Sequence, residues 1–316
     1  MKIIAKILAF TMLLLCALPL CACAESTQTE GISIVCTSFA PFDFAREIAG
    51  EGANVKMLLS PGADSHSYDP TPKDILAVNK CDVFVYVGGE SDVWVEDILS
   101  SIDNPDMKTI KLIECTEELY CEEYKEGMDH GHDHSHGHDG TEYDEHVWTD
   151  PRNAAIICEK IAAALCAADE ENADKYNENL ASYKAELSKL DEAFKAVVAN
   201  GNGKPLIFGD RFPLIYFVKA YGLDYYAAFP GCAADTEPSG ATVAYLINKV
   251  KEENIPVVFH IELSTGKIAD TICEATGASK MQFNACHNVT KDDFNAGVRY
   301  IDLMWDNVEA LKAALK

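Results

Sequence analysis

The sequence contains few basic residues, and acidic residues outnumber them. It contains 26 Lys and Arg against 51 Asp and Glu, for a formal net charge of −25. Proteins that bind nucleic acids need a basic surface to displace counterions, so this composition excludes nucleic acid as a partner. An acidic surface instead attracts cations.

Long apolar runs are missing except near the N-terminus, where one stretch extends from Ile7 to Leu20. It is shorter than the roughly 20 residues that a transmembrane helix needs. Two lysines precede it and Ala22-Cys23 follows it, a pattern typical of a bacterial lipoprotein signal. An uncleaved membrane anchor is the alternative.

This pattern predicts where the protein is located. We expect residues 1–23 to be a lipoprotein signal peptide, Cys23 to carry a lipid anchor, and residues 24–31 to form a polar tether. The protein would then be held by its lipid on the outer face of the bacterial cytoplasmic membrane, or lie in the periplasm.

The cysteines lack the CxxC spacing of a zinc knuckle or a redox site. Nine of the 12 cysteines follow Cys23, and an exported protein can oxidise them. Because nine is an odd number, at least one should stay a free thiol. Cys158 and Cys166 fall in a helical pattern, where we expect small buried hydrophobic side chains.

Short β-rich runs alternate with helical patterns in two blocks, which predicts an α/β fold of two lobes with mostly parallel sheets. The expected strands are 32–39, 54–60, 82–88 and 109–114, then 205–209, 224–229, 256–262 and 280–285. The last helical pattern predicts one closing helix from Asp292 to Leu315.

A helical stretch without glycine or proline separates the two blocks, from Glu170 to Ala199. At about 1.5 Å per residue it would be roughly 45 Å long, enough to run beside both lobes. We therefore predict an N-terminal lobe at 32–168, a rigid connecting helix at 169–200 and a C-terminal lobe at 201–316. A helix that belongs to one lobe only is the alternative.

Histidines are concentrated in one polar, glycine-rich segment, the loop 129–139. Its five histidines are His130, His132, His134, His136 and His138. Alternating imidazoles with interspersed aspartates make weak, exchanging sites for zinc, copper or nickel. A solvated charged loop that binds metal only during purification is the alternative.

Two further histidines lie in loops just before helices. His66 follows an expected strand in LLSPGADSHSYDPTPKDI, and His146 precedes Asp150-Pro151, a helix start signal, in DEHVWTDPRNA. Loops at a sheet edge are where α/β folds place their ligands. Both histidines are therefore candidate metal ligands.

Four features of the sequence together match a known family: PGADSHSYDPTPKDI, DEHVWTDPRNA after a histidine-rich loop, the long helix and YFVKAYGL. In these features the chain resembles the zinc- and manganese-specific solute-binding proteins of ABC importers. It implies two α/β lobes bridged by a rigid helix, a metal site in the interlobe cleft, and His66 and His146 as ligands from the N-terminal lobe. It also implies delivery of the ion to a membrane permease with its ATPase, and we expect a monomer.

The C-terminal half departs from the pattern of that family. Arg211 stands where relatives carry a third ligand, His or Glu, and a guanidinium group has no free lone pair for a metal. Its neighbour Asp210 is the candidate replacement. Alternatively, Asp210 pairs with Arg211 or caps the following helix.

His287 lies about where relatives carry the last ligand, and we expect it to bind the ion. His260, in the apolar run VVFHIE, is interpreted as a core histidine. The reserve donors are Glu262, Glu237, Cys286 and Cys232, and for the two cysteines a mutual disulfide or simple burial is the alternative.

The predicted ligands are therefore His66, His146, His287 and Asp210. Three imidazoles and one carboxylate at roughly 2.0–2.2 Å suit tetrahedral Zn²⁺, whereas two of each favour Mn²⁺. The sequence predicts a transition-metal-binding component of an ABC importer and no enzyme. A secreted zinc hydrolase and a metal-binding surface adhesin are the alternatives, although HExxH and GxSxG motifs are missing.

Overall fold

The structure is a computed structural model that describes residues 31–64, 68–129, 143–231 and 237–316. Gly31–Lys316 forms one compact unit. Within the described ranges, no helix has both the length and the apolar character needed to cross a membrane.

Two four-stranded sheets form the centre of the fold, and all their strand pairs are parallel. The first sheet contains β1 (Ser33–Cys36), β2 (Asn54–Met57), β3 (Val83–Tyr86) and β4 (Lys108–Lys111). The second contains β5 (Leu206–Phe212), β6 (Tyr225–Pro230), β7 (Val257–His260) and β8 (Ser279–Gln282). The predicted fold class, two lobes with parallel sheets, is confirmed.

Both sheets have the same topology, with orders β2-β1-β3-β4 and β6-β5-β7-β8. In each sheet the direction of winding reverses beside the first strand, between β1 and β3 and between β5 and β7. Parallel α/β sheets bind ligands at the carboxyl ends of the strands at this point. Each lobe therefore offers one such edge.

Helices cover both faces of the first sheet because its strands are apolar on both sides. These helices are α2 (Phe39–Ala49), α3 (Pro72–Lys80), α4 (Val93–Ser101) and α5 (Pro151–Ala168). Alternate residues along a strand point to opposite faces, so Ile34 packs in the cluster of α2 and α5 and Val35 in the cluster of α3 and α4.

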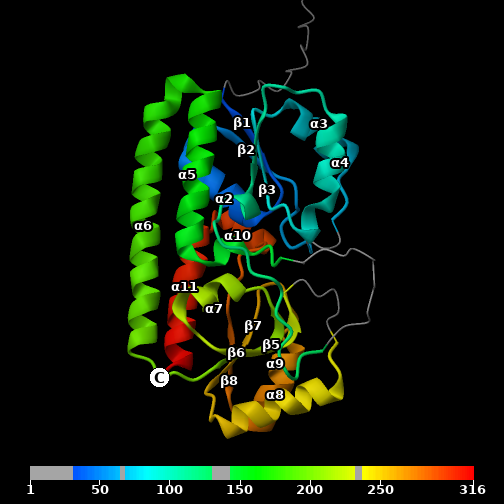
Figure 1. Ribbon diagram of the computed structural model, residues 1–316, viewed down its shortest axis with the longest axis vertical. Helices are drawn as coiled ribbons and strands as arrows, with labels where there is room; N and C mark the ends of the chain where they lie inside the picture. The colour runs from blue at the N-terminus through cyan, green and yellow to red at the C-terminus, as the bar shows by residue number, and fades with distance from the viewer. Residues whose placement is uncertain (1–30, 65–67, 130–142, 232–236) are drawn as a thin grey trace, which may run out of the picture. The chain divides into compact units, whose positions relative to one another are not determined.

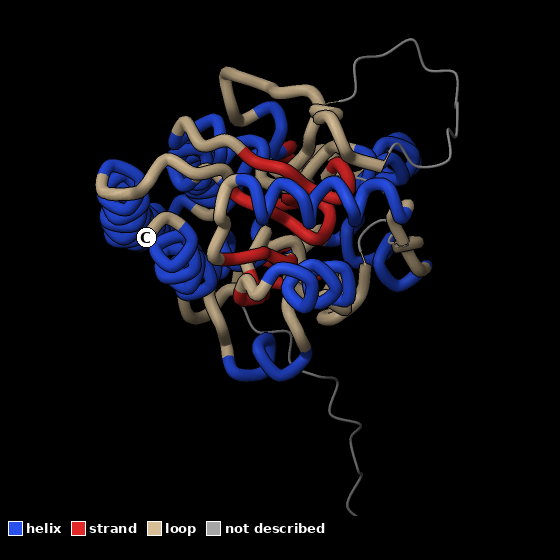
Figure 2. The backbone as a smooth tube through the Cα atoms, turned by 90° about the horizontal axis from the view of Figure 1, so that it is seen from below, coloured by secondary structure: helices blue, strands red, loops and turns tan. Residues whose placement is uncertain are grey.

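The second sheet has the same layering (Figures 1 and 2). Its helices are α7 (Ile215–Tyr221), α8 (Gly240–Glu252), α9 (Lys267–Thr276), α10 (Lys291–Ala296) and α11 (Tyr300–Ala314). Ile207 packs with α8 and α9, whereas Phe208 faces α7 and α11 and joins the same buried cluster as Ile34 of the first sheet. One continuous apolar core therefore serves both sheets.

The long helix α6 (Ala173–Ala199) packs against both halves of the fold (Figure 1). It contacts α2 and α5 beside the first sheet and α7 and α11 beside the second. Its buried side includes Tyr183, Leu187, Leu190 and Phe194, at the helical spacing of the predicted stripe. The predicted long helix is present; the limits of the two lobes stay a prediction.

A strap, residues 120–129, leads from the first half onto the second half of the fold. Lys125 pairs with Asp224, and the amide of Asp129 donates to the carbonyl of Ala228 over 2.9 Å. The carboxylate of Asp129 accepts the amide of Ser239 at 2.5 Å, at the start of α8. The halves are therefore joined by the strap as well as by α6.

Two elements differ from the prediction. The closing helix is interrupted, because Gly297 adopts a left-handed φ of 74° that ends α10 before α11 begins. Strand β5 extends through Asp210 and Arg211 to Phe212, with a register irregularity between Phe208 and Arg211. The irregular end of β5 lies at the edge where a ligand is expected.

Candidate metal centre

His146 is positioned by a tight turn that leads into α5. Asp150 caps this helix with its side chain and Pro151 occupies the first turn, as the sequence predicts. Before them, Asp144 accepts two hydrogen bonds from His146, from its amide at 2.8 Å and from its Nδ1 at 2.9 Å. The ring is thereby fixed in direction and in tautomer.

The other ring nitrogen of His146 is available to a ligand. Because Nδ1 carries the proton donated to Asp144, Nε2 presents its lone pair. Nε2 is buried and has no hydrogen-bond partner among the described residues. Burial lowers the pKa of His146, but the neighbouring Asp144 carboxylate outweighs burial and raises the pKa above its usual value. A buried nitrogen of this kind fits a metal ion.

Glu145 adds a carboxylate beside the two imidazoles. It is fully buried, and its side chain accepts the amide of Ser91 at 3.0 Å and the hydroxyl of Ser91. Burial alone would raise the pKa of Glu145, but the neighbouring His287 imidazole, the charge of His146 and the Ser91 hydroxyl lower it to about 2. Glu145 is therefore ionised at neutral pH.

His287 reaches this pair from the second half of the fold. Its ring centroid lies 4.5 Å from that of His146, and its Nε2 lies 3.6 Å from Oε1 of Glu145. Trp148 packs against both imidazoles, with centroid distances of 5.4 and 5.3 Å. The apolar indole limits the access of water to the site.

Glu145, His146 and His287 place one donor atom each within 4.8 Å of one another. A small movement of the side chains would bring each of these atoms within roughly 2.0–2.2 Å of a zinc ion placed between them. Two neutral imidazoles and one carboxylate are borderline donors, suited to first-row transition metals. The described part of the site thus fits a divalent ion.

Several predicted site residues lie outside the described residues. They are His66, His130, His132, His134, His136, His138 and the lipidation site Cys23. Their roles stay predictions. The described residues bring together His146 and His287 from the predicted set.

Asp210 does not belong to the group formed by Glu145 and the two histidines. It is buried at the end of β5, where its carboxylate accepts the amide of Arg211 at 2.9 Å and that of Ile261 at 3.3 Å. Asp210 as a ligand stays a prediction that this arrangement does not favour.

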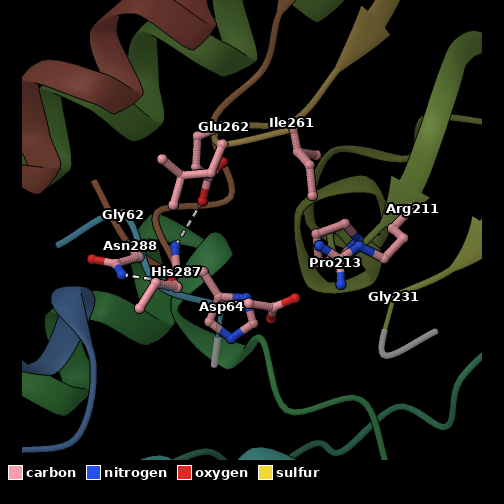
Figure 3. A pocket seen from close by; sticks show the side chains of 11 residues that line it. Gly62, Asp64, Arg211, Pro213, Gly231, Ile261, Glu262, His287 and Asn288 are labelled. Carbon is pink, nitrogen blue, oxygen red and sulfur yellow. Dashed lines mark hydrogen bonds between the residues drawn. The ribbon is translucent and has the colours of Figure 1, made fainter. Parts of the chain in front are cut away.

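Arg211 and His287 line one pocket of about 120 Å³ from opposite sides (Figure 3). Asp64 and Glu262 also line this pocket. The cation at the position of the expected third ligand thus faces the metal-binding side of the fold.

Glu262 and His260 have other hydrogen-bond partners, Cys286 is buried, and Glu237 does not belong to the group formed by Glu145 and the two histidines. The carboxylate of Glu262 accepts two backbone amides, and His260 Nδ1 lies 3.0 Å from the carbonyl of Ile261. Cys286 is fully buried, and burial raises the pKa of its thiol well above the usual range. The eight cysteines of the described ranges are all free thiols, whereas Cys232 lies outside these ranges.

Glu145, Asp144 and Trp148 are the site residues that sequence reasoning missed. Their one sequence signal is that they flank His146 in DEHVW. The contacts of Glu145 to Ser91 and His287 join segments far apart in the chain, so the local pattern does not reveal them.

The whole described unit is similar to proteins of zinc uptake. The family model "Zinc-uptake complex component A periplasmic" matches residues 34–314. "Zinc-binding lipoprotein AdcA" of Streptococcus pneumoniae is 32% identical over 299 residues, covering 94% of this chain and 59% of the relative. The chain therefore spans little more than half of that relative.

A second relative matches along nearly its whole length. "High-affinity zinc uptake system protein ZnuA" of Bacillus subtilis is 31% identical over 319 residues, covering 95% of each chain. The crystal structure of the Zn(II)-bound ZnuA-like domain of Streptococcus pneumoniae AdcA has a TM-score of 0.73 at 28% identity. That match covers 90% of this chain and 99% of the domain.

Proposed function

We propose, from the premise that this chain belongs to the zinc-uptake component A family, that it captures zinc outside the cytoplasmic membrane and delivers it to an ABC permease. The convergence of Glu145, His146 and His287 from both halves of the fold carries this proposal. The names of the AdcA and ZnuA relatives, which specify zinc, support the choice of ion over manganese.

We propose the ligand set His66, His146, His287 and Glu145. The first three keep the predicted imidazoles, and Glu145 replaces Asp210 as the oxygen ligand because it lies beside His287 whereas Asp210 is held by backbone amides. Three imidazoles and one carboxylate close a tetrahedral site.

Competition of the purified protein with a chromophoric zinc chelator tests this proposal. We expect one tight site per chain, which His146→Ala and His287→Ala each weaken by at least about 100-fold because a ligand is lost. Glu145→Gln should weaken the site similarly, whereas Asp210→Asn should change affinity by less than about tenfold.

The paired carboxylate variants decide between two ligand sets. A large loss in Asp210→Asn with little change in Glu145→Gln would restore Asp210 to the site. Unchanged affinity in both histidine variants would contradict the proposed function, since the tight site would then lie elsewhere.

We propose the finer points of location and partners on the sequence signal and the family. Cys23 would carry the lipid anchor, and the permease with its ATPase would receive the ion from a monomer. The chain would act as a binding protein and not as an enzyme, because a closed four-ligand site leaves no position for a reacting water. Adhesion to a surface stays an alternative prediction.

A further inference from the structure

Glu262 lies at the carboxyl end of β7, at the winding reversal of the second sheet, and contacts the segment that carries His287. We propose that Glu262 is a positioning residue that sets the direction of the His287 imidazole and thereby the zinc affinity. The proposal rests on the proposed function of the site and goes beyond its ligand set.

The carboxylate of Glu262 bridges two amides of one short loop. Its Oε2 accepts the amide of Ala285 at 2.7 Å, and its Oε1 accepts the amide of His287 at 2.8 Å. Figure 3 shows the Glu262 side chain pointing at the backbone of the His287 segment. Two amides that converge on one anion form a backbone nest, here with an anion supplied by the protein itself.

The residue between these amides has a strained backbone. Cys286 has a φ of 59°, in the left-handed region that residues other than glycine rarely adopt. Cys286 is fully buried and has a Cβ, which makes a left-handed φ energetically costly. Hydrogen bonds from other parts of the fold must therefore hold this conformation. The two hydrogen bonds to Glu262 lie on either side of Cys286 and stabilise its conformation.

Other contacts fix the same loop from the first half of the fold. The carbonyl of His287 accepts the amide of Phe39 at 3.2 Å, and the indole of Trp148 donates to the carbonyl of Ala285 at 2.7 Å. Among these contacts, Glu262 is the one that supplies charge. The result places Nε2 of His287 at 3.6 Å from Glu145.

The geometry separates this role from direct metal binding. Both oxygens of Glu262 already accept amides, and Glu262 does not belong to the group formed by Glu145, His146 and His287. It therefore acts on the ion through His287. A Gln side chain would offer one oxygen, and its amino group would face the second amide donor.

A double-mutant cycle between Glu262→Gln and His287→Ala tests the proposal, with zinc affinity measured by chelator competition. Glu262→Gln alone should lower affinity by roughly 10- to 100-fold, the usual effect of an outer-shell partner. In the His287→Ala background, the same change should alter affinity by less than about threefold, because its target is gone. Glu274→Gln, an exposed carboxylate on α9, is the matched control and should change neither protein.

Equal losses in both backgrounds would overturn the proposal, since Glu262 would then act on the ion directly or on the fold as a whole. Unchanged affinity in Glu262→Gln would overturn it as well. Urea unfolding of the metal-free proteins checks the fold, and Glu262→Asp, too short to bridge both amides, replaces Glu262→Gln in the cycle if that variant does not unfold cooperatively. Failure of the unaltered protein to bind zinc tightly would instead contradict the proposed function.

Discussion

His146 offers a metal ion only its Nε2, because its Nδ1 is bonded to Asp144 at 2.9 Å. Both histidines of the described site must be deprotonated to bind, and binding therefore competes with protons. The pH dependence of zinc affinity therefore follows from the ligand side chains.

Zinc affinity should fall as the pH drops through the pKa of His146, which the Asp144 carboxylate raises above the usual histidine value of about 6.5. Protonated imidazoles have no lone pair for zinc, and two or more of them gain protons together. Chelator competition at pH 7.5, 6.5, 5.5 and 5.0 measures this. Affinity that stays constant between pH 7.5 and 5 would argue against histidine ligands.

The sequence identified His146 and His287 but could not identify Glu145. The histidines are rare residues in recognisable loops, whereas Glu145 is one acid among 51 acidic residues. What distinguishes Glu145 is burial between Ser91 and His287, which depends on how distant segments meet. Local sequence patterns do not reveal contacts between distant segments.

At the scale of elements, α2 and α11 meet at a buried carboxylate. Asp43 of α2 accepts the amide of Tyr300 at 2.8 Å and pairs with Arg46, which also donates to the carbonyl of Val298 at 3.0 Å. Asp43 is fully buried, and burial outweighs Arg46 and raises the pKa of Asp43 to about 6. The junction of these helices is therefore sensitive to pH.

Asp43→Asn should gain stability relative to the unaltered protein as the pH rises from 4 to 7. The folded protein keeps the proton on Asp43 up to about pH 6, whereas the unfolded chain releases it near the ordinary aspartate pKa of 3.8. The stabilisation that is present below pH 3.8 is therefore lost across this window. Two pKa units correspond to up to about 3 kcal/mol of unfolding free energy. Urea unfolding of both metal-free proteins at four pH values measures the difference.

Asp306→Asn, at an exposed position of α11, is the control for loss of one charge on the same helix. A stability difference between the Asp43 variant and the unaltered protein that does not vary with pH would show that Asp43 keeps an ordinary pKa.

Most helices and strands could be predicted from periodicity, but two boundaries could not. The apolar pattern passes through Val298 into α11, so the left-handed Gly297 that breaks the closing helix is hidden in it. The polar pair Asp210 and Arg211 suggested that β5 had ended, yet backbone pairing with β6 continues to Phe212. Pairing with β6 decided the end of β5, whereas the local conformation of Gly297 decided the break in the closing helix.

At the scale of the molecule, one buried cluster includes side chains of both sheets, for example Ile34 and Phe208. Residues of α6 and α11 also belong to this cluster, and the strap adds polar contacts between the halves. Such continuity couples the unfolding of the two lobes.

The metal-free protein should therefore unfold in one cooperative transition, although its length suggests two domains. Differential scanning calorimetry should give equal calorimetric and van't Hoff enthalpies, and zinc should shift the single transition to higher temperature. Two separated transitions, of which zinc shifts only one, would show that the lobes fold independently.

The histidine-rich loop should assist capture without forming the tight site. Replacing its five histidines, His130, His132, His134, His136 and His138, by asparagine keeps the chain length and the strap anchor at Asp129. We expect weak additional zinc binding to disappear and one tight site to remain, as measured by isothermal titration calorimetry. Loss of the tight site would contradict this division of roles.

The shared strand order of the two sheets makes hybrid proteins a practical route to altered metal choice. Each half is the same winding module, so a crossover placed within α6 would exchange the whole C-terminal half together with its proposed ligand His287. The strap limits this freedom, because residues 120–129 of one parent must fit α8 and β6 of the other. Parents whose sequences match at the strap and where it contacts α8 and β6 should give more stable hybrids than parents chosen for overall identity.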